Sequence, residues 1–356
     1  MFSKMVKKSN DDNVMNDKTI EYLSNFNKNC IFSVYGFYCA LDVLKNGSSG
    51  KVSKEIDDLK IDKNILDLIK TDDFFLNTTM LLLHNGYNIN SKYSEYLKKY
   101  DVTLGSIDMN KLEKEIKNLN TSISRSTDNN LRDVLSPKSF DDLFMFIVIS
   151  ILYFKNAWER KFSIKNTKKL PFYNDINNEE IFMMTQYGSS YYYYENQDHQ
   201  FISLPYSTYP YKMIIALPKK QNAINNPNLS DAIKNMDEYE IEELVIPKFS
   251  IELEQNLIEQ CELMGATSMF KASSDFDKII DDKDQLIYIQ EFKQKSFINV
   301  DENGTSAGSV TFAIGRNDSC MPPKYKGKAN FIANRPFSYF VMKNNTIIFA
   351  GKFYNY

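Results

Sequence analysis

The stretch VDENGTSAGS, residues 300–309, is the part of the sequence that bears most on the fold. It follows an alternating apolar and polar run over residues 286–300, which is typical of a β-strand. Two more strand-like runs, joined at a polar turn, lie between residues 337 and 354. Small residues fill the stretch, and no proline occurs between Glu302 and Asp318. Taken alone, this pattern indicates a flexible loop between strands.

Helix patterns are concentrated in the first part of the chain. They cover residues 31–44, which end at the helix-stopping NGSSG, and residues 53–59, 111–119 and 256–265. Strand patterns dominate the rest, and the apolar run at residues 144–149 predicts a strand buried on both faces. Shorter strands are predicted around residues 204–206, 211–218 and 244–249. This order favours an α+β fold, and no linker or repeat divides the chain into domains.

The composition of the chain bears on its binding partners and on its location in the cell. The 356 residues are 43% hydrophobic and 25% charged, with a formal net charge of −3, so no global positive field favours nucleic acid or an anionic membrane. The N-terminal residues lack the apolar core of a secretory signal, and the strongest apolar run, residues 143–154, is too short to span a bilayer. Four scattered cysteines without CxxC spacing predict free thiols rather than disulfides or zinc. We therefore expect a cytosolic protein.

The sequence offers no constellation for catalysis. His84 lies beside a turn and His199 in a polar stretch, and neither has an acid/base or metal-ligand spacing around it. No glycine-rich segment matches a P-loop or a dinucleotide fingerprint, and the Asp281-Asp282 pair is typical of a solvated surface. We expect no enzyme activity, no cofactor and no metal.

Nine short motifs, in one order along nearly the whole chain, resemble those of the serpin family. YFKNAWERKF at residues 153–162 is similar to the family's YFKGxWExxF and contains the only tryptophan, Trp158. The other eight begin at residues 29, 120, 183, 204, 246, 263, 275 and 334. The resemblance implies one domain over residues 1–356, with about nine helices around three β-sheets. It also implies an exposed reactive-centre loop at about residues 302–323.

Residues 300–309 resemble the hinge of that loop. In serpins a protease cleaves the loop and forms an acyl-enzyme, and the loop then inserts as a strand into the main sheet and distorts the protease. The implied hinge residues are Glu302, Gly304, Thr305, Ser306, Ala307, Gly308 and Ser309. The alternate positions that would face inward are all small, including Thr311, and a charge or proline there would impede insertion. The pattern predicts an inhibitory member.

The resemblance also suggests a bait residue. In the commonest spacing the scissile-bond residue is the seventeenth counted from the hinge glutamate, which places the bond between Asp318 and Ser319. Aspartate is what caspases and granzyme B require, and poxviral serpins that block these proteases carry it at the matching place. A shift of two residues would make Arg316 the bait for trypsin-like enzymes, and a shift of one would make Asn317 the bait for a legumain-like protease. A non-inhibitory serpin acting as a binding module is a further alternative.

Three positions depart from the family pattern. Val34 stands where proline is usual, Ser150 where asparagine is usual, and Gln294 where histidine is common. These positions belong to the region where the sheet opens, so the balance between metastable and inserted states is expected to differ from that of other serpins. We expect a monomer that targets a host cysteine or serine protease with Asp specificity and suppresses apoptosis and inflammation.

Overall fold

The computed structural model describes residues 10–59, 75–100, 102–127, 129–140, 146–174, 178–220, 224, 226–282, 286–305 and 325–355. The chain forms two compact units, each assembled from separate segments. The first contains residues 1–34, 154–251 and 298–356, and the second contains residues 35–153 and 252–297. Because the segments alternate, no single cut in the chain would separate the two units.

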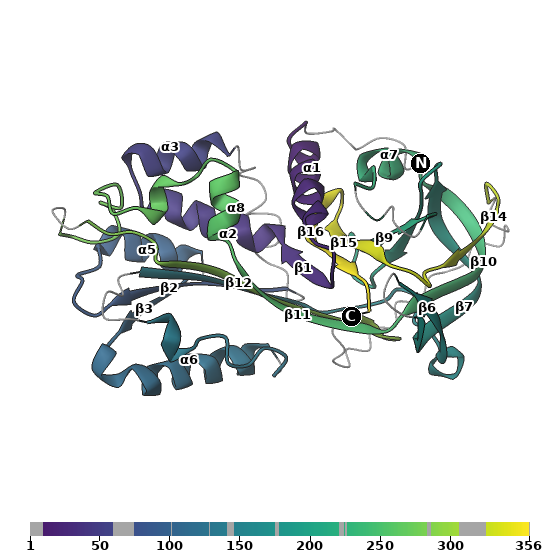
Figure 1. Cartoon of the computed structure of the whole chain (residues 1–356), viewed down its shortest axis with the longest axis horizontal. Helices are drawn as coiled ribbons and strands as arrows, with labels where there is room; N and C mark the ends of the chain where they lie inside the picture. Colours follow the sequence, from purple (N-terminus) through teal and green to yellow (C-terminus); the bar gives the residue numbers. More distant parts are fainter. Residues whose placement is uncertain are drawn as a thin grey trace. The chain divides into compact units, whose positions relative to one another are not determined.

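The first unit is built on a nine-stranded sheet (Figure 1). Its strand order is β1 (Cys30–Ser33), β16 (Thr346–Phe353), β15 (Phe337–Lys343), β9 (Tyr211–Pro218), β8 (His199–Pro205), β7 (Asn178–Glu195), β10 (Asp237–Pro247) and β14 (Lys328–Ile332), with β6 (Lys168–Tyr173) beside β7. Helix α1 (Asn10–Ser24) packs on β16, and Asn16 binds the backbone of Asn345 and Ile347. Helix α7 (Leu229–Asn235) packs against β7.

Most of the other sheet lies in the second unit. Its strands run in the order β3 (Thr103–Ile107), β2 (Phe75–His84), β4 (Phe146–Phe154) and β12 (Glu291–Val300), with β11 (Phe249–Asn256) beside β12. Helix α6 (Leu112–Ser126) lies on one face of this sheet in Figure 1. The other face carries helices α2 (Val34–Asn46), α3 (Gly50–Asp58), α5 (Ser91–Lys99) and α8 (Ile258–Leu263). Every residue of β4 is buried, as its continuous apolar run predicts.

The α+β fold expected from the sequence is confirmed, with two differences in detail. The part of the chain that the structure describes contains seven α-helices, against about nine expected. Its strands join into two hydrogen-bonded sheets, against three expected. The second difference arises because β7 is 18 residues long and pairs with β6 near its start and with β8 near its end. One continuous strand thereby connects regions that would otherwise be separate sheets.

The bounds of two predicted helices differ from those in the structure. The helix predicted from residue 31 begins only at Val34, because Cys30–Ser33 forms strand β1 and pairs with β16. Sheet pairing thus overrides a helical spacing that the apolar side chains also satisfy. The helix predicted over residues 111–119 is longer than expected and runs as α6 to Ser126. The predicted strand Tyr211–Pro218 is confirmed, as is the turn between β15 and β16, where Asn344 has φ 54°.

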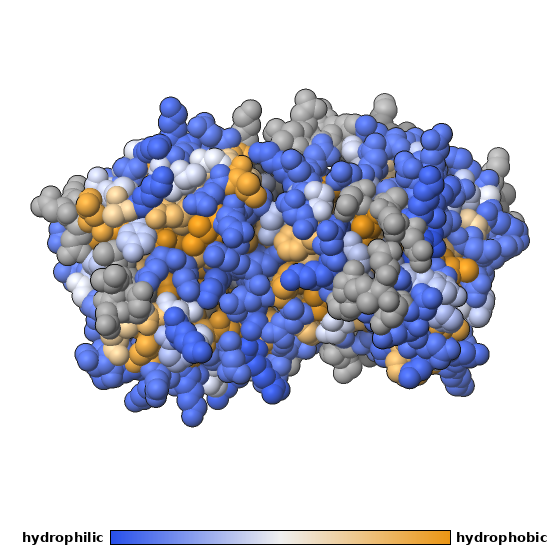
Figure 2. Space-filling model, viewed as in Figure 1, coloured by the Kyte–Doolittle hydropathy of each residue, from blue (hydrophilic) through white to orange (hydrophobic). Residues whose placement is uncertain are grey.

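The surface and the cysteines can be compared with the expectations from composition. Hydrophilic residues dominate the face drawn in Figure 2, and hydrophobic residues show between them in small groups. Among the described ranges, no helix is long and apolar enough to cross a membrane, and no three His, Cys, Asp or Glu side chains gather as metal ligands would. No disulfide joins Cys30, Cys39 or Cys261, and burial raises the pKa of Cys30 to about 11.

Candidate functional site

The hinge turn, which we define as residues 301–305, directly follows the end of β12. Its ends are joined by backbone hydrogen bonds between Asp301 and Gly304 at 3.0 and 3.3 Å. The Asp301 carboxylate also accepts a bond from the backbone N–H of Asn303 at 2.8 Å. An aspartate that binds the backbone two residues ahead is a common way to close a turn. The sequence DENG therefore folds locally into a tight reversal after the strand.

Glu302 anchors this turn to the first unit. Its side chain is 6% exposed and forms an ion pair with Lys248 at 2.9 Å. Its other carboxylate oxygen accepts a hydrogen bond from the Thr167 hydroxyl at 2.8 Å. Burial alone raises the pKa of Glu302, but the hydrogen bonds from Lys248, from the backbone and from Thr167 outweigh it and leave the pKa lowered. The carboxylate is therefore held in its charged form.

Trp158 and Tyr206 hold the other side of the turn. The Trp158 indole N–H donates to the carbonyl of Asp301 at 2.9 Å, and its backbone N–H donates to the carbonyl of Asn303 at 2.9 Å. The indole stacks on Tyr206 with ring centroids 4.7 Å apart and an interplanar angle of 10°. The Tyr206 hydroxyl shares a hydrogen bond of 2.5 Å with that of Thr305, and both residues are buried. An aromatic pair therefore supports the hinge.

The last two residues of the hinge turn already form a strand. β13 (Gly304–Thr305) runs antiparallel to both of its neighbours, pairing Thr305 with Val300 of β12 on one side and with Asn156 of β5 (Asn156–Ala157) on the other. The pairing requires glycine, because a Cβ on Gly304 would lie 2.2 Å from the Asn156 carbonyl oxygen. Gly304 and Thr305 therefore occupy the place of a sheet strand between β12 and β5.

In the second unit, β4 and β12 pair directly with each other. Residues 147–153 run parallel to residues 291–297, and we call this pairing the β4–β12 seam. Ser150 and Gln294 are partners in its register, and both are fully buried. The Ser150 hydroxyl has no hydrogen-bond partner among the described residues, whereas the Gln294 amide oxygen accepts a bond from Ser296 at 3.4 Å. The two departures noted in the sequence thus face each other in the sheet.

The structure covers only part of the predicted site. It brings Glu302, Gly304 and Thr305 together in the anchored turn. The remaining hinge and bait residues lie outside the described residues: Ser306, Ala307, Gly308, Ser309, Arg316, Asn317, Asp318 and Ser319.

Sequence reasoning missed several residues that build this site. Lys248 and Tyr206 lie in the predicted strands at residues 244–249 and 204–206 and have no predicted role, although each binds a hinge side chain. Thr167 carried no signal, because it contacts Glu302 across 135 residues of sequence. Asn156 stands at the glycine position of the YFKGxW pattern, and its side-chain amide nitrogen is buried without a partner among the described residues. The replacement of glycine by asparagine at this position is the feature of the sequence that could have identified Asn156.

Known proteins resemble this chain over almost its whole length. A family model described as serpin (serine protease inhibitor) matches residues 19–356. A serpin-like protein of Acanthamoeba polyphaga mimivirus is 28% identical, covering 97% of this chain and 91% of its own. Human neuroserpin is 26% identical, covering 87% of this chain and 77% of its own.

Solved structures show the same fold. A serpin of the insect Tenebrio molitor matches with a TM-score of 0.80 at 20% identity, covering 98% of this chain and 99% of its own. Native protease nexin-1 with heparin matches with a TM-score of 0.80 at 21% identity, covering 98% and 97%. Members of the family are generally protease inhibitors rather than catalysts, though some do not inhibit. The family model, the relatives and the fold agree, and the chain belongs to the serpin family.

Proposed function

We propose that this protein is a suicide-substrate inhibitor with Asp318 as its bait, and that it traps an Asp-specific protease, a caspase or granzyme B. Cleavage after Asp318 would leave an acyl-enzyme, and insertion of the loop into the sheet would distort the bound protease before hydrolysis. The inhibitor would thereby suppress apoptosis and inflammation in the host cell. The observation that carries the proposal is strand β13, which begins an antiparallel strand between β12 and β5.

The register of β13 supports insertion along a defined path. Because Thr305 pairs with Val300 and Asn156, each later loop residue would meet the residue one step earlier on β12 and on the β5–β4 side. Six residues on, Thr311 would lie opposite Gln294 and Ser150, which are already partners in the β4–β12 seam. The two neighbouring strands thus predict the same register independently. An antiparallel strand that fills the seam would replace its parallel ladder, which is slightly less stable per residue.

The chemistry at the meeting point also supports this path. Thr311 would bring a hydroxyl to a place where the buried Ser150 hydroxyl has no partner among the described residues. A buried polar group without a partner is unfavourable by about 1–3 kcal/mol, so a new hydrogen bond there would favour the inserted state. Insertion would therefore be favoured by a hydrogen bond that the Ser150 hydroxyl lacks in the closed sheet.

Aspartate is favoured as the bait because it lies at the commonest family distance from the anchored Glu302. Caspases and granzyme B use basic pockets, which bind a carboxylate with charge-assisted hydrogen bonds. Arg316, with trypsin-like targets, and Asn317, with a legumain-like target, are the alternatives at shorter spacing. The likeness to a mimivirus protein over 97% of the chain supports a viral setting for this activity.

We further propose that residues 1–356 act as one domain and as a monomer in the host cytosol. No nucleic acid, membrane or cofactor takes part in this function. The net charge of −3 supports the exclusion of polyanionic partners, because it provides no attraction to them.

The test is to mix the protein with granzyme B, an inflammatory caspase, an executioner caspase, trypsin and legumain. Denaturing electrophoresis and mass spectrometry would identify stable complexes and the cleaved bond. We expect a covalent complex and a cut after Asp318, lost in Asp318→Ala. The control Thr305→Arg keeps the bait but places a charge at a residue that is 1% exposed, so it should be cut without trapping.

The other outcomes decide between the alternatives. A trapped complex cut after Arg316 or Asn317 would support the inhibitory function but would assign it to a different target protease. Clean proteolysis, with no complex and no gain in heat stability, would exclude inhibition and leave a non-inhibitory binding module.

A further inference from the structure

The sequence Asn-Gly occurs three times in the chain, at Asn46–Gly47, Asn85–Gly86 and Asn303–Gly304. In this dipeptide the backbone nitrogen of glycine can attack the side-chain amide of asparagine, which closes a five-membered ring and releases ammonia. Glycine favours this attack because it has no Cβ to obstruct the ring. Ring closure also requires an asparagine side chain and a peptide group that can rotate, and a base near the glycine nitrogen.

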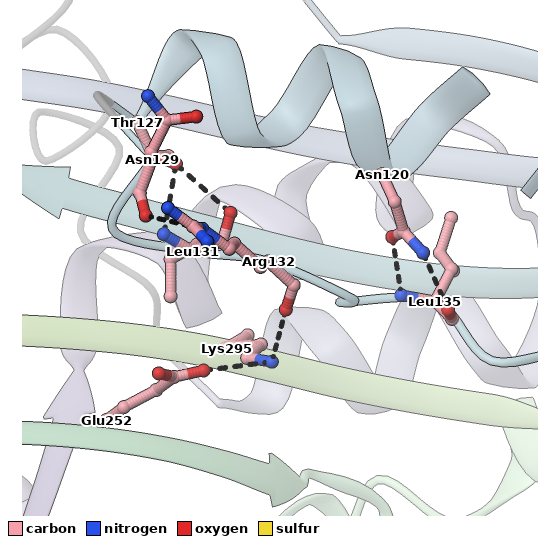
Figure 3. Close-up of polar contacts among 8 residues, drawn as sticks. All are labelled: Asn120, Thr127, Asn129, Leu131, Arg132, Leu135, Glu252 and Lys295. Atoms are coloured by element: carbon pink, nitrogen blue, oxygen red, sulfur yellow. Dashed lines mark hydrogen bonds and ion pairs between the residues drawn. The ribbon is translucent and has the colours of Figure 1, made fainter. Parts of the chain in front are cut away.

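Asn120 shows how contacts within the fold can immobilise an asparagine. Its side-chain amide accepts a hydrogen bond from the Leu135 N–H at 2.9 Å and donates one to the Leu135 carbonyl at 2.8 Å (Figure 3). A rotation of this amide towards its own backbone would break both bonds. Asparagines that are held in this way are therefore protected from ring closure.

The first Asn-Gly pair is held in a similar way. The Asn46 amide donates to the Tyr96 hydroxyl at 2.8 Å. Gly47 is buried directly after α2, and its N–H donates to the carbonyls of Val43 and Leu44, each at 3.2 Å. Carbonyl oxygens hold this nitrogen in the helical turn but are not bases. We therefore expect this pair to be protected.

The backbone of the third pair is fixed by strand β13. Gly304 is buried and pairs with Ala157 of β5. Its N–H donates to the carbonyl and to the carboxylate of Asp301, each at 3.3 Å. The Asn303 carbonyl accepts from the backbone N–H of Trp158 at 2.9 Å. Ring closure would rotate the peptide group between Asn303 and Gly304 and break these bonds, so we expect this pair to be protected as well.

The second pair lies in the turn between β2 and α5, and it is the one of the three in which both residues are exposed. The Gly86 N–H donates to Nδ1 of His84 at 3.0 Å. Since a backbone N–H can only donate, this Nδ1 carries no proton and can accept one. Imidazole is also a stronger base than a carboxylate. A bond from the Tyr87 N–H to the His84 carbonyl at 3.2 Å closes the turn, and the Gly86 N–H takes no part in it.

We propose that Asn85–Gly86 is a site of spontaneous deamidation, with His84 as its general base. Nδ1 of His84 takes the proton of the Gly86 N–H as the Gly86 nitrogen forms a bond to Cγ of Asn85. The bond from Cγ to the amide nitrogen then breaks, and this nitrogen takes the proton back from the imidazole and leaves as ammonia. Water opens the five-membered imide at either of its carbonyl carbons. The products are aspartate and isoaspartate, in which the chain runs through the former side chain.

Either product changes the charge and the shape of the turn. A carboxylate replaces a neutral amide, so the chain gains one negative charge beyond its formal net charge of −3. Isoaspartate also lengthens the backbone of the turn. The bonds on both sides limit the distortion, because the Asn85 N–H donates to the Ile107 carbonyl at 3.1 Å and the Asn88 carbonyl accepts from the Asp281 N–H at 2.9 Å. We therefore expect charge variants of a folded protein, whether or not it inhibits a protease.

The test compares the three pairs within the intact chain. The protein is incubated at neutral pH in water enriched in heavy oxygen. Peptide mass spectrometry with electron-transfer fragmentation then locates each new carboxylate and separates aspartate from isoaspartate. We expect Asn85 to react at least about tenfold faster than Asn46 or Asn303, with heavy oxygen in every product. In denaturant the protecting contacts are lost, so the three rates should agree within about threefold.

Variants separate the action of a base from the mobility of the turn. His84→Phe keeps an aromatic ring near Tyr87, whose ring centroid lies 6.1 Å away, but removes the base. We expect about tenfold slower deamidation, with unchanged hydrogen exchange at the Tyr87 N–H. His84→Ala leaves space for added imidazole, which should restore part of the rate. As a matched control, Tyr87→Leu removes the ring contact but keeps the base, so the rate should stay within about twofold.

The outcomes test the site and the base separately. Equal rates at the three pairs of the folded chain, or faster reaction at Asn46 or Asn303, would overturn the site. Preferential reaction at Asn85 that His84→Phe leaves unchanged or accelerates would overturn the role of His84. Failure of added imidazole to raise the rate in His84→Ala would also overturn that role, because the loss would then reflect a change in the turn.

Discussion

The hinge turn and the β4–β12 seam differ in how well their polar groups are satisfied. In the hinge turn, Glu302 has both carboxylate oxygens bound, and the backbone carbonyls of Asp301 and Asn303 accept bonds from Trp158. In the seam, the Ser150 hydroxyl is buried without a partner among the described residues. If the loop inserts as proposed, its starting point is held by satisfied polar groups, whereas the sheet at Ser150 contains a buried hydroxyl without a partner among the described residues. Four changes test this contrast, beginning with the largest expected effect.

Gly304→Ala should disturb the hinge turn most. The added Cβ would lie 2.2 Å from the Asn156 carbonyl oxygen and 2.6 Å from the Ala157 Cα, both in backbone that cannot easily move. We expect a loss of about 3 kcal/mol in the free energy of unfolding, as for other overpacked sites. Hydrogen exchange at Thr305 should rise, because its pairing with β5 is broken. Chemical denaturation and exchange mass spectrometry measure the two effects.

Gly188→Ala is the matched control for this prediction. Gly188 has φ +59°, and no atom lies within 4 Å of an added Cβ. Its loss should be limited to the backbone penalty of about 1 kcal/mol, with no change of exchange at Thr305. Equal losses in the two variants would show that the close approach at Gly304 does not matter.

Glu302→Gln tests the anchor itself. The amide keeps the shape of the side chain but loses the ion pair with Lys248, so we expect a loss of about 2 kcal/mol in the free energy of unfolding. Lys248→Met should lose at least as much, because it leaves a carboxylate that is 6% exposed without its cation. In the double variant the two losses should not add, since one interaction is removed by either change. Additive losses would contradict a shared anchor.

The same carboxylate predicts a dependence on pH. The pKa of Glu302 is lowered below its ordinary value of 4.5, so the folded state favours the charged form. This contribution to stability is present above pH 4.5 and disappears as the pH falls through the lowered value. The difference in stability between wild type and Glu302→Gln, measured by denaturation at several pH values, should therefore shrink below pH 4.5. A difference that persists unchanged into that range would show that the charge is not what stabilises the turn.

The α+β class could be predicted from the sequence because it depends on local signals. The buried run that becomes β4 and the small residues after Val300 can be recognised without knowledge of their neighbours. The partners of Glu302 could not be recognised in this way, because Thr167 and Lys248 reach it only through the pairing of distant strands. The helix prediction fails at residues 31–33 for the same reason, since the pairing of β1 with β16 is not local. The bait assignment to Asp318 remains a prediction, because it lies outside the described residues.

Ser150→Ala should have the smallest effect and the opposite sign. It removes a buried hydroxyl that has no partner among the described residues, so the closed protein should become more stable by about 1 kcal/mol. Ser296→Ala is the control, because its hydroxyl donates to Gln294 at 3.4 Å and its removal should destabilise the protein slightly. If Thr311 meets Ser150 after insertion, Ser150→Ala should also reduce the gain in heat stability that follows loop cleavage. A destabilised closed state would show that Ser150 already has a partner, and the seam would then be as well satisfied as the hinge turn.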